Sequence, residues 1–261
     1  QTCALPILGI IELHSTPNTF RHVIYSYAAN GIGGHDGSGS VFENCIITGL
    51  PVFPEEGEDH GRWHCHGFEF EACNDCIFDN NHIETDIYHG IEIEGSANNV
   101  MITNNTINIY GKAIDLHDPQ NSVITNNIIT MYQDTWAIEV NECHNCTIGN
   151  NTINAFGGHG IESNNSDSTS ITDNYVNAHE GIQISYGSNY TVVGNTIDNT
   201  SDYGIRFHGS ENTIIENTPM KRFGESDELN GAIHYLCSEA SKFVTGTVTP
   251  VDGGFNAYAG L

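Results

Sequence analysis

Acidic side chains recur at one position of a repeated segment, and they are the feature of this sequence most able to do chemistry. They follow a small residue and a large apolar one, as in His89-Gly-Ile-Glu-Ile-Glu94 and Lys112-Ala-Ile-Asp-Leu-His117. Stacked carboxylates can share protons, bind a hard cation, or divide acid and base roles in sugar chemistry. A solvated acidic face that does no chemistry is the alternative. The column consists of Glu69, Glu92, Asp115, Glu139 and Glu162.

The candidate residues fall into three roles. The predicted catalytic residues are the acids and the histidine that proton transfer needs, namely Asp115, His117, Asp118, Glu92 and Glu139. The predicted substrate-binding residues offer cations, imidazoles or an aromatic face, namely His89, Lys112, Trp136, His159 and Arg206. A calcium ion is a possible cofactor, and its predicted ligands are Glu69, Glu92 and Glu94.

A repeat with a period in the twenties must position these side chains. Small residues open the segments at spacings of 21 to 24 residues, namely Gly67, Gly90, Ala113, Ala137, Gly160, Gly181 and Gly204. An asparagine recurs in phase, at Asn81, Asn105, Asn127, Asn151, Asn174, Asn195 and Asn217. The alternation of β-branched and polar residues predicts a β-solenoid with coils about 4.8 Å apart. Stacked Asn amides are expected to pass hydrogen bonds between coils.

The repeat in residues 64–218 resembles the right-handed β-helix family with short parallel-β-helix repeats, which is related to pectate-lyase-like and NosD-like proteins. The resemblance implies an all-β, single-stranded right-handed parallel β-helix, which we expect over residues 8–218. It implies no single activity, because this fold carries lyases, hydrolases, epimerases, adhesins and binding modules. Residues 50–65 break the period, and we expect an acidic loop there that either walls a groove or is simply solvated.

The segment 112–118 resembles the Asp-Pro-His-Asp motif of mannuronan C5-epimerases. Asp115, His117 and Asp118 match the motif, and Leu116 replaces its proline. The resemblance implies that His117 is the base that abstracts a proton beside the carboxylate of a sugar. This chain departs from the family in having Lys112 where a tyrosine is usual, and in having few basic residues for uronate carboxylates.

The strongly acidic charge balance limits the kinds of molecule that this protein can bind. The chain has 261 residues with 33 Asp and Glu against 7 Lys and Arg, a formal net charge of −26. This argues against nucleic acid, since phosphate binding needs a basic face, and favours bound cations. The sequence contains no run of 18 apolar residues, so it predicts no transmembrane helix. The chain starts at Gln1 without Met and shows no signal peptide, so we expect a truncated N-terminus; the oligomeric state stays open.

Eight cysteines include two Cys-x-x-Cys pairs, Cys73–Cys76 and Cys143–Cys146. The pairs lie three coils apart, or roughly 14 Å at the spacing of stacked strands. That distance is too large for one tetrahedral zinc site. We therefore expect small buried hydrophobic residues, with local disulfides as the alternative.

Residues 219–261 do not continue the repeat. Helical spacing over 226–240 and a predicted strand at 243–248 give a short α/β tail. Arg222-Phe-Gly, Phe243-Val-Thr-Gly246 and Val251-Asp-Gly-Gly254 resemble the C-terminal segment of short-chain dehydrogenases. No Tyr-x-x-x-Lys pair accompanies them, so we expect neither NAD binding nor dehydrogenase activity. We expect a chimeric or captured segment whose amphipathic helix covers the open end of the solenoid.

These patterns predict a secreted or cell-surface protein that binds or processes a polysaccharide along its acidic face. If it is an enzyme, which the sequence leaves open, a lyase, an epimerase or a glycoside hydrolase is expected. The alternative is a non-catalytic surface or adhesive solenoid that binds cations.

Overall fold

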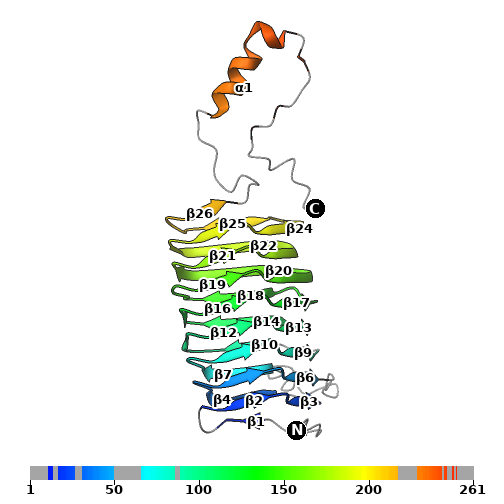
Figure 1. Ribbon diagram of the computed structural model, residues 1–261, viewed down its shortest axis with the longest axis vertical. Coiled ribbons are helices and arrows are strands. Elements are labelled where there is room, and N and C mark those ends of the chain that lie inside the picture. Colours follow the sequence, from blue (N-terminus) through cyan, green and yellow to red (C-terminus); the bar gives the residue numbers. More distant parts are fainter. Residues whose placement is uncertain are drawn as a thin grey trace, which may run out of the picture.

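Short parallel strands stack coil on coil along the long axis of the protein (Figure 1). The computed structural model describes residues 11–13, 17–26, 31–49, 66–85, 89–216, 228–242, 244–245, 249 and 251. Every strand pairing within these residues is parallel, so the predicted parallel β-helix is confirmed. The segment 50–65, predicted as an acidic loop, lies outside the described residues.

The strands form three columns. The first carries the acidic positions and consists of β1 (Ile11–Glu12), β4 (Ile32–Asp36), β7 (His66–Ala72), β10 (His89–Ile93), β14 (Lys112–His117), β18 (Trp136–Asn141), β20 (Thr152–Asp167), β22 (Tyr175–Ser188) and β25 (Ile205–His208). The second consists of β3 (Ile24–Ser26), β6 (Ile46–Gly49), β9 (His82–Thr85), β13 (Thr106–Ile109), β17 (Ile128–Met131) and β24 (Thr196–Asp198). The long strands β20 and β22 pair with both columns and join them into one sheet of 15 strands.

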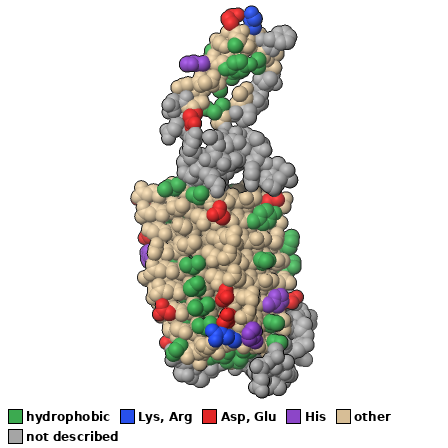
Figure 2. Space-filling model, in the orientation of Figure 1, with side chains coloured by type: hydrophobic (Ala, Val, Ile, Leu, Met, Phe, Trp, Pro, Cys, Tyr) green, Lys and Arg blue, Asp and Glu red, His purple; other side chains and the backbone are tan. Residues whose placement is uncertain are grey.

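The third column is a separate sheet of nine strands. It consists of β2 (Thr19–Arg21), β5 (Val41–Glu43), β8 (Ile77–Asp79), β12 (Met101–Thr103), β16 (Val123–Thr125), β19 (Thr147–Gly149), β21 (Ser170–Thr172), β23 (Thr191–Val193) and β26 (Ile214–Glu216). A small two-stranded sheet pairs β11 (Ala97–Asn98) with β15 (Pro119–Gln120). Figure 2 shows one face of the stack, on which few charged side chains lie and hydrophobic side chains form short rows.

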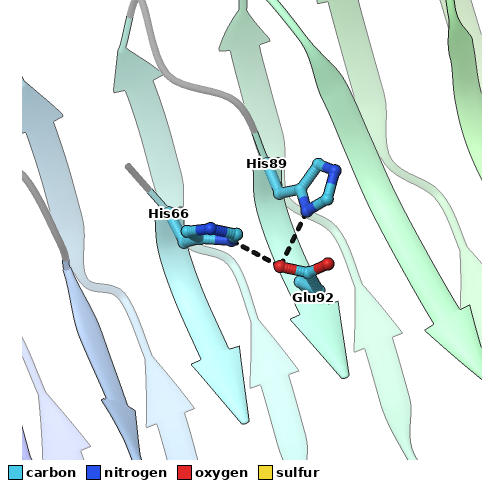
Figure 3. A group of neighbouring side chains, drawn as sticks. All are labelled: His66, His89 and Glu92. Atoms are coloured by element: carbon cyan, nitrogen blue, oxygen red, sulfur yellow. Dashed lines mark ion pairs between the residues drawn. The ribbon is translucent and has the colours of Figure 1, made fainter. Parts of the chain in front are cut away.

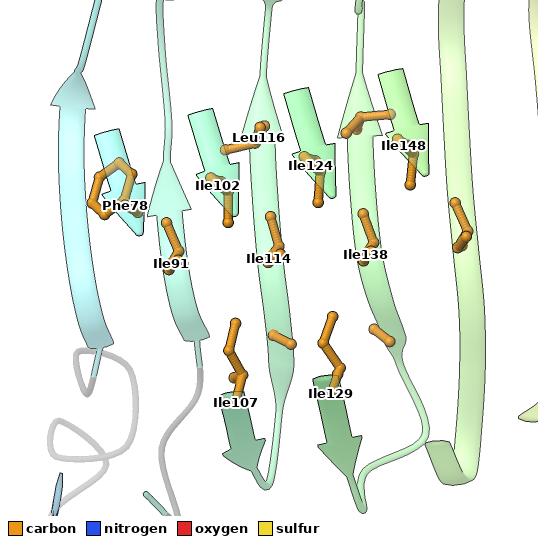
Figure 4. Close-up of a cluster of buried hydrophobic side chains, with 14 of the residues drawn as sticks. Phe78, Ile91, Ile102, Ile107, Ile114, Leu116, Ile124, Ile129, Ile138 and Ile148 are labelled. Atoms are coloured by element: carbon orange, nitrogen blue, oxygen red, sulfur yellow. The ribbon is translucent and has the colours of Figure 1, made fainter. Parts of the chain in front are cut away.

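Inward isoleucines from successive coils form the core (Figure 4). Ile91, Ile114 and Ile138 are register partners on β10, β14 and β18, and each is fully buried. Burying such a side chain contributes about 1.5–3 kcal/mol, and the repeat places one in every coil. Because alternate residues point to opposite faces, the same strands must present their intervening polar residues outward.

The predicted asparagine ladder is confirmed from Asn81 to Asn195. Asn105 Nδ2 donates to Phe78 O at 2.9 Å and to Asn127 Oδ1 at 3.0 Å, and Asn127 Oδ1 also accepts the Asn105 backbone N–H. The same pattern joins the next members of the column. The ladder therefore satisfies buried backbone groups at each turn. Asn217, which the repeat also predicts as a member, lies outside the described residues.

The residue before each ladder asparagine makes the turn. Asn104, Asn126 and Asn150 have φ angles of 58°, 60° and 52°, in the left-handed region that Asn tolerates better than most residues. The doubled Asn-Asn of the repeat thus has two functions, because the first residue bends the backbone and the second bonds to the next coil.

The cysteines of the two Cys-x-x-Cys pairs are buried as expected, but they form local disulfides, which was the alternative. Cys73 bonds to Cys76 and Cys143 to Cys146. In each pair the residue before the second cysteine has a positive φ, which folds the chain back. The resulting Cα–Cα distances of 5.7 and 6.3 Å lie within the disulfide range.

The tail contains α1 (Leu229–Leu236) and the 3₁₀ turn η2 (Glu239–Ser241). The helix lies beyond the β26 end of the stack in Figure 1, and none of its residues is buried. Its covering of the open end stays a prediction. The predicted strand at 243–248 is wrong at Val244 and Thr245, which pair with no strand among the described residues. No helix in the described ranges is long and apolar enough to cross a membrane.

Candidate functional site

The strand register places the acidic column on one face. Glu92 pairs with Glu69 on one side and with Asp115 on the other, and Asp115 then pairs with Glu139. Glu139 pairs with Glu162 on β20. The predicted column therefore exists as five consecutive rungs of the first sheet, and its members are neighbours across strands.

The column is not the uniformly solvated ladder that simple alternation predicts. Glu92 is 6% exposed and Asp115 is 2% exposed, whereas the other three members are partly exposed. Repulsion among the two buried carboxylates is offset by cationic and imidazole side chains rather than by bulk salt. Sequence reasoning identified the rungs, but it did not predict these partners.

Two histidines converge on Glu92 at one end of the site (Figure 3). His66 Nδ1 and His89 Nδ1 lie 2.5 and 2.7 Å from the same atom, Glu92 Oε2. Burial acts to raise the pKa of Glu92, but the hydrogen bonds from His66 and His89 lower it to about 2. Residues three apart lie on opposite faces of a regular strand, so the His89–Glu92 contact shows that β10 departs from strict alternation.

Asp115 is the centre of the middle group. Its Oδ2 lies 2.9 Å from Lys112 Nζ and its Oδ1 lies 3.5 Å from His117 Nε2. Burial acts to raise the pKa of Asp115, but His117 and Lys112 hold it below its ordinary value. Lys112 Nζ also lies 2.6 Å from Glu139 Oε2 on β18. Burial acts to lower the pKa of Lys112, but both carboxylates raise it well above its ordinary value.

His117 is the member of the middle group that solvent reaches. Its side chain is 45% exposed, whereas that of Asp115 is 2% exposed. The nearby Asp115 carboxylate raises the pKa of His117 against the effect of burial; Glu139 adds to the increase and Lys112 opposes it. The buried Asp115 carboxylate thus controls the orientation and basicity of the half-exposed His117 imidazole. Acid–base catalysts use such an arrangement.

The raised pKa of His117 predicts a pH-dependent stability. A group whose pKa is higher in the folded state stabilises the fold below its unfolded value of about 6.5, and this contribution is lost as pH rises through the folded value. We therefore expect His117→Gln to destabilise the protein more at pH 6 than at pH 9, as measured by urea unfolding. His82→Gln on β9 is the control, and an equal pH trend in both variants would contradict the prediction.

A third group surrounds His159 on β20. His159 Nε2 lies 3.0 Å from Asp134 Oδ1, and its Nδ1 lies 3.2 Å from Glu180 Oε2. The Trp136 ring lies against this imidazole, with centroids 4.7 Å apart. Tyr203 donates to Glu180 at 2.5 Å; burial and that carboxylate raise the pKa of the phenol well above its ordinary value. Arg206 lies over the Tyr203 ring at 5.2 Å.

The predicted site residues thus separate along the face. Lys112, Asp115, His117 and Glu139 form one contacting group, and His89 joins it through Asp115 at 3.8 Å. Trp136 and His159 belong to the third group. Arg206 pairs in register with Gln183 and lies three rungs beyond Glu139. Asp118 is exposed in the turn after β14, where its N–H donates to Asn141 O.

Three contacting residues were not among the predicted site residues, namely His66, Asp134 and Glu180. His66 could have been found, because it shares a register column with His89 and Lys112. Asp134 could not, because it lies in the connection between β17 and β18, outside the repeated segments.

Within the part of the chain that the structure describes, three groups of side chains offer possible metal ligands, with ligand atoms within 4.8 Å of one another. The predicted calcium ligands Glu69, Glu92 and Glu94 form one of them. The other two combine imidazoles with a carboxylate, namely His66, His89 and Glu92, and His159, His179 and Glu180.

Known oxidoreductases match only a short part of the chain. An uncharacterized oxidoreductase of Haemophilus influenzae is 61% identical over 51 residues, 19% of this chain and 18% of that protein. The uncharacterized oxidoreductase UxuB of Bacillus subtilis is 50% identical over 56 residues, 21% of this chain and 20% of that protein. The chain thus spans about a fifth of the length of these curated relatives. The identity over this short segment confirms a partial resemblance to short-chain dehydrogenases.

The family comparison covers nearly the whole chain, in agreement with the stacked coils and the asparagine ladder. The family described as "Right handed beta helix region" matches residues 9–129 and 120–259. No solved structure matches the chain. The chain belongs to the right-handed β-helix family.

Proposed function

We propose that this protein binds and processes an extracellular polysaccharide on the face of β10, β14 and β18. The observation that carries the proposal is the half-exposed His117 imidazole held against the buried carboxylate of Asp115. A flat parallel sheet face with outward side chains in regular rows suits an extended polymer laid across the strands.

The favoured chemistry is proton abstraction beside a sugar carboxylate, as in a lyase or an epimerase. Asp115 is too buried to contact a glycan, so it is a positioning residue that orients His117 and increases its basicity. His117 removes the proton with its other ring nitrogen, Nδ1, because Nε2 faces Asp115. The electron pair left on the sugar carbon then expels the glycosidic oxygen in a lyase, or takes up a proton from the opposite face in an epimerase. The Lys112 ammonium, between Asp115 and Glu139, is the cation nearest to a uronate carboxylate bound there.

Hydrolysis is the second candidate, and the surroundings of Glu162 favour it. Burial and the neighbouring Glu139 raise the pKa of Glu162, although Gln183 donates to it. Glu139 on the adjacent strand is instead paired with Lys112 and Asn141. Two neighbouring carboxylates in unlike surroundings are what a glycosidase needs to separate its acid from its base or nucleophile.

A non-catalytic, cation-binding solenoid is the remaining candidate, and calcium at Glu69, Glu92 and Glu94 would belong to it. Glu92 Oε2 is already shared by two imidazoles, whose nitrogens are not preferred calcium ligands. The calcium site therefore stays a prediction, as does the secreted or cell-surface location.

Product analysis separates these candidates. The full chain is incubated with acidic and neutral polysaccharides, with and without chelator, and unsaturated ends, reducing ends and uronate composition are measured. We expect unsaturated ends or altered uronate composition from an acidic polysaccharide, and we expect Glu162→Gln to retain this activity. Saturated reducing ends that Glu162→Gln abolishes would support hydrolysis instead. A chain that binds these polymers without altering them would support the non-catalytic candidate.

A further inference from the structure

We propose that His66, His89 and Glu92 form a binding site for a divalent transition metal of the zinc class. The site uses neither His117 nor Lys112, although His89 lies beside Asp115, which orients His117 in the proposed function. The ligand atoms would be His66 Nδ1, His89 Nδ1 and Glu92 Oε2, which converge from the adjacent strands β7 and β10 (Figure 3).

Burial makes this group unlike an ordinary acidic surface cluster. His66 and His89 are each 4% exposed, and Glu92 is 6% exposed. The backbones that carry the two imidazoles are register partners in a continuous sheet, so their separation is fixed by strand pairing. Preorganised side chains on rigid strands lower the cost of assembling a metal site.

The donor set selects the kind of metal. Two imidazole nitrogens and one carboxylate oxygen suit zinc and its first-row neighbours, and three protein ligands are typical of zinc sites that keep an open position. Calcium and magnesium instead prefer oxygen ligands. The proposed site therefore differs from the predicted calcium group in its ligands, although both include Glu92.

The second nitrogen of His89 faces a carboxylate. His89 Nε2 lies 3.8 Å from Asp115 Oδ2, on the side of the ring away from Glu92. Metal-binding histidines commonly place their other ring nitrogen against a carboxylate, which fixes the tautomer and the ring orientation. The register that brings Asp115 beside β10 thus supplies an outer partner for the proposed ligand.

The site needs only a small adjustment to hold the ion. Ligands about 2.0–2.1 Å from a tetrahedral zinc ion lie roughly 3.3 Å apart. The present distances from Glu92 Oε2 to the two imidazole nitrogens, 2.5 and 2.7 Å, are shorter than this. Withdrawing the Glu92 carboxylate by roughly 1 Å opens the space for the ion.

Titration calorimetry of the metal-stripped full chain with zinc chloride tests the proposal. We expect the wild-type protein to bind zinc more tightly than calcium, and Glu92→Gln and His89→Gln each to weaken zinc binding at least about tenfold. Glu94→Gln, which removes the same charge from an exposed neighbour, is expected to bind zinc as the wild type does. His179→Gln controls for the group at His159, His179 and Glu180.

Two measurements keep the result independent of misfolding and of glycan activity. Far-UV circular dichroism without metal identifies variants that fail to fold, and cobalt binding to the wild-type protein is followed by its visible ligand-field absorption. A ligand-field absorption that disappears when zinc displaces the cobalt ion supports a metal site with nitrogen and oxygen ligands. Zinc binding no tighter than calcium binding would overturn the proposal, as would zinc binding that depends on His179 but not on Glu92.

Discussion

We expect His117→Gln to reduce polysaccharide turnover by about 10²- to 10⁴-fold, the contribution typical of a general acid–base group. Glutamine keeps a polar group of similar length but cannot exchange a proton near neutral pH. Because Asp115 acts only through His117, Asp115→Asn should reduce the rate and also shift the acidic limb of the pH–rate profile downward, since the carboxylate raises the pKa of His117. Initial rates of product formation from pH 5 to 9 measure both effects.

The control for this prediction is the same substitution on another face. His82 lies on β9 in the second column, so His82→Gln should leave both the rate and the pH profile unchanged. Turnover that survives in His117→Gln would remove this residue from the chemistry and direct attention to the carboxylates Glu139 and Glu162. An unchanged pH profile in Asp115→Asn would show that Asp115 has only a structural role.

Asn127→Ala is expected to destabilise the fold by about 3–6 kcal/mol, a large part of the stability of an ordinary domain. The Asn127 amide donates to Ile102 O and Asn151 Oδ1 and accepts from the backbone and side chain of Asn105. Its removal leaves several buried groups without partners, each costing about 1–3 kcal/mol. Urea unfolding followed by circular dichroism gives the difference.

Asn108→Ala is the matched control for the ladder. Asn108 lies on β13 with its side chain half-buried, outside the column of inward amides. Its replacement should cost no more than about 0.5 kcal/mol, as for most surface positions. Equal losses in the two variants would show that the ladder adds nothing beyond the packing of the coils.

The sequence was sufficient to predict the register, for a physical reason. Each coil repeats the same inward and outward alternation, so a shift by one residue would turn Glu92 into the apolar core in place of Ile91. The asparagine phase sets the turns independently, and both signals agree. The fold and the carboxylate column were therefore predictable from the spacing of the repeated residues alone.

The partners of the carboxylates were not predictable in the same way. Spacing places His89 and Glu92 outward on one strand, with a column rich in histidine beside the carboxylates, but it does not show that two imidazoles share one carboxylate oxygen. The His89–Glu92 contact depends on a local departure in β10, and its consequence is a lowered pKa at Glu92, where carboxylate crowding alone predicts an increase. The disulfides were uncertain for a similar reason, because the turn geometry at Asp75 and Asn145 decides whether two cysteines meet.

The asparagine ladder has a consequence for how such proteins diversify. Each coil starts and finishes with the same amide in the same conformation, so a block such as the residues between Asn105 and Asn127 can be duplicated or deleted in frame without breaking the chain of bonds. Every such event lengthens or shortens the outer face by one row of side chains, about 4.8 Å. Genetic recombination can therefore change the length of the outer face while the packing and hydrogen bonding of each coil stay the same.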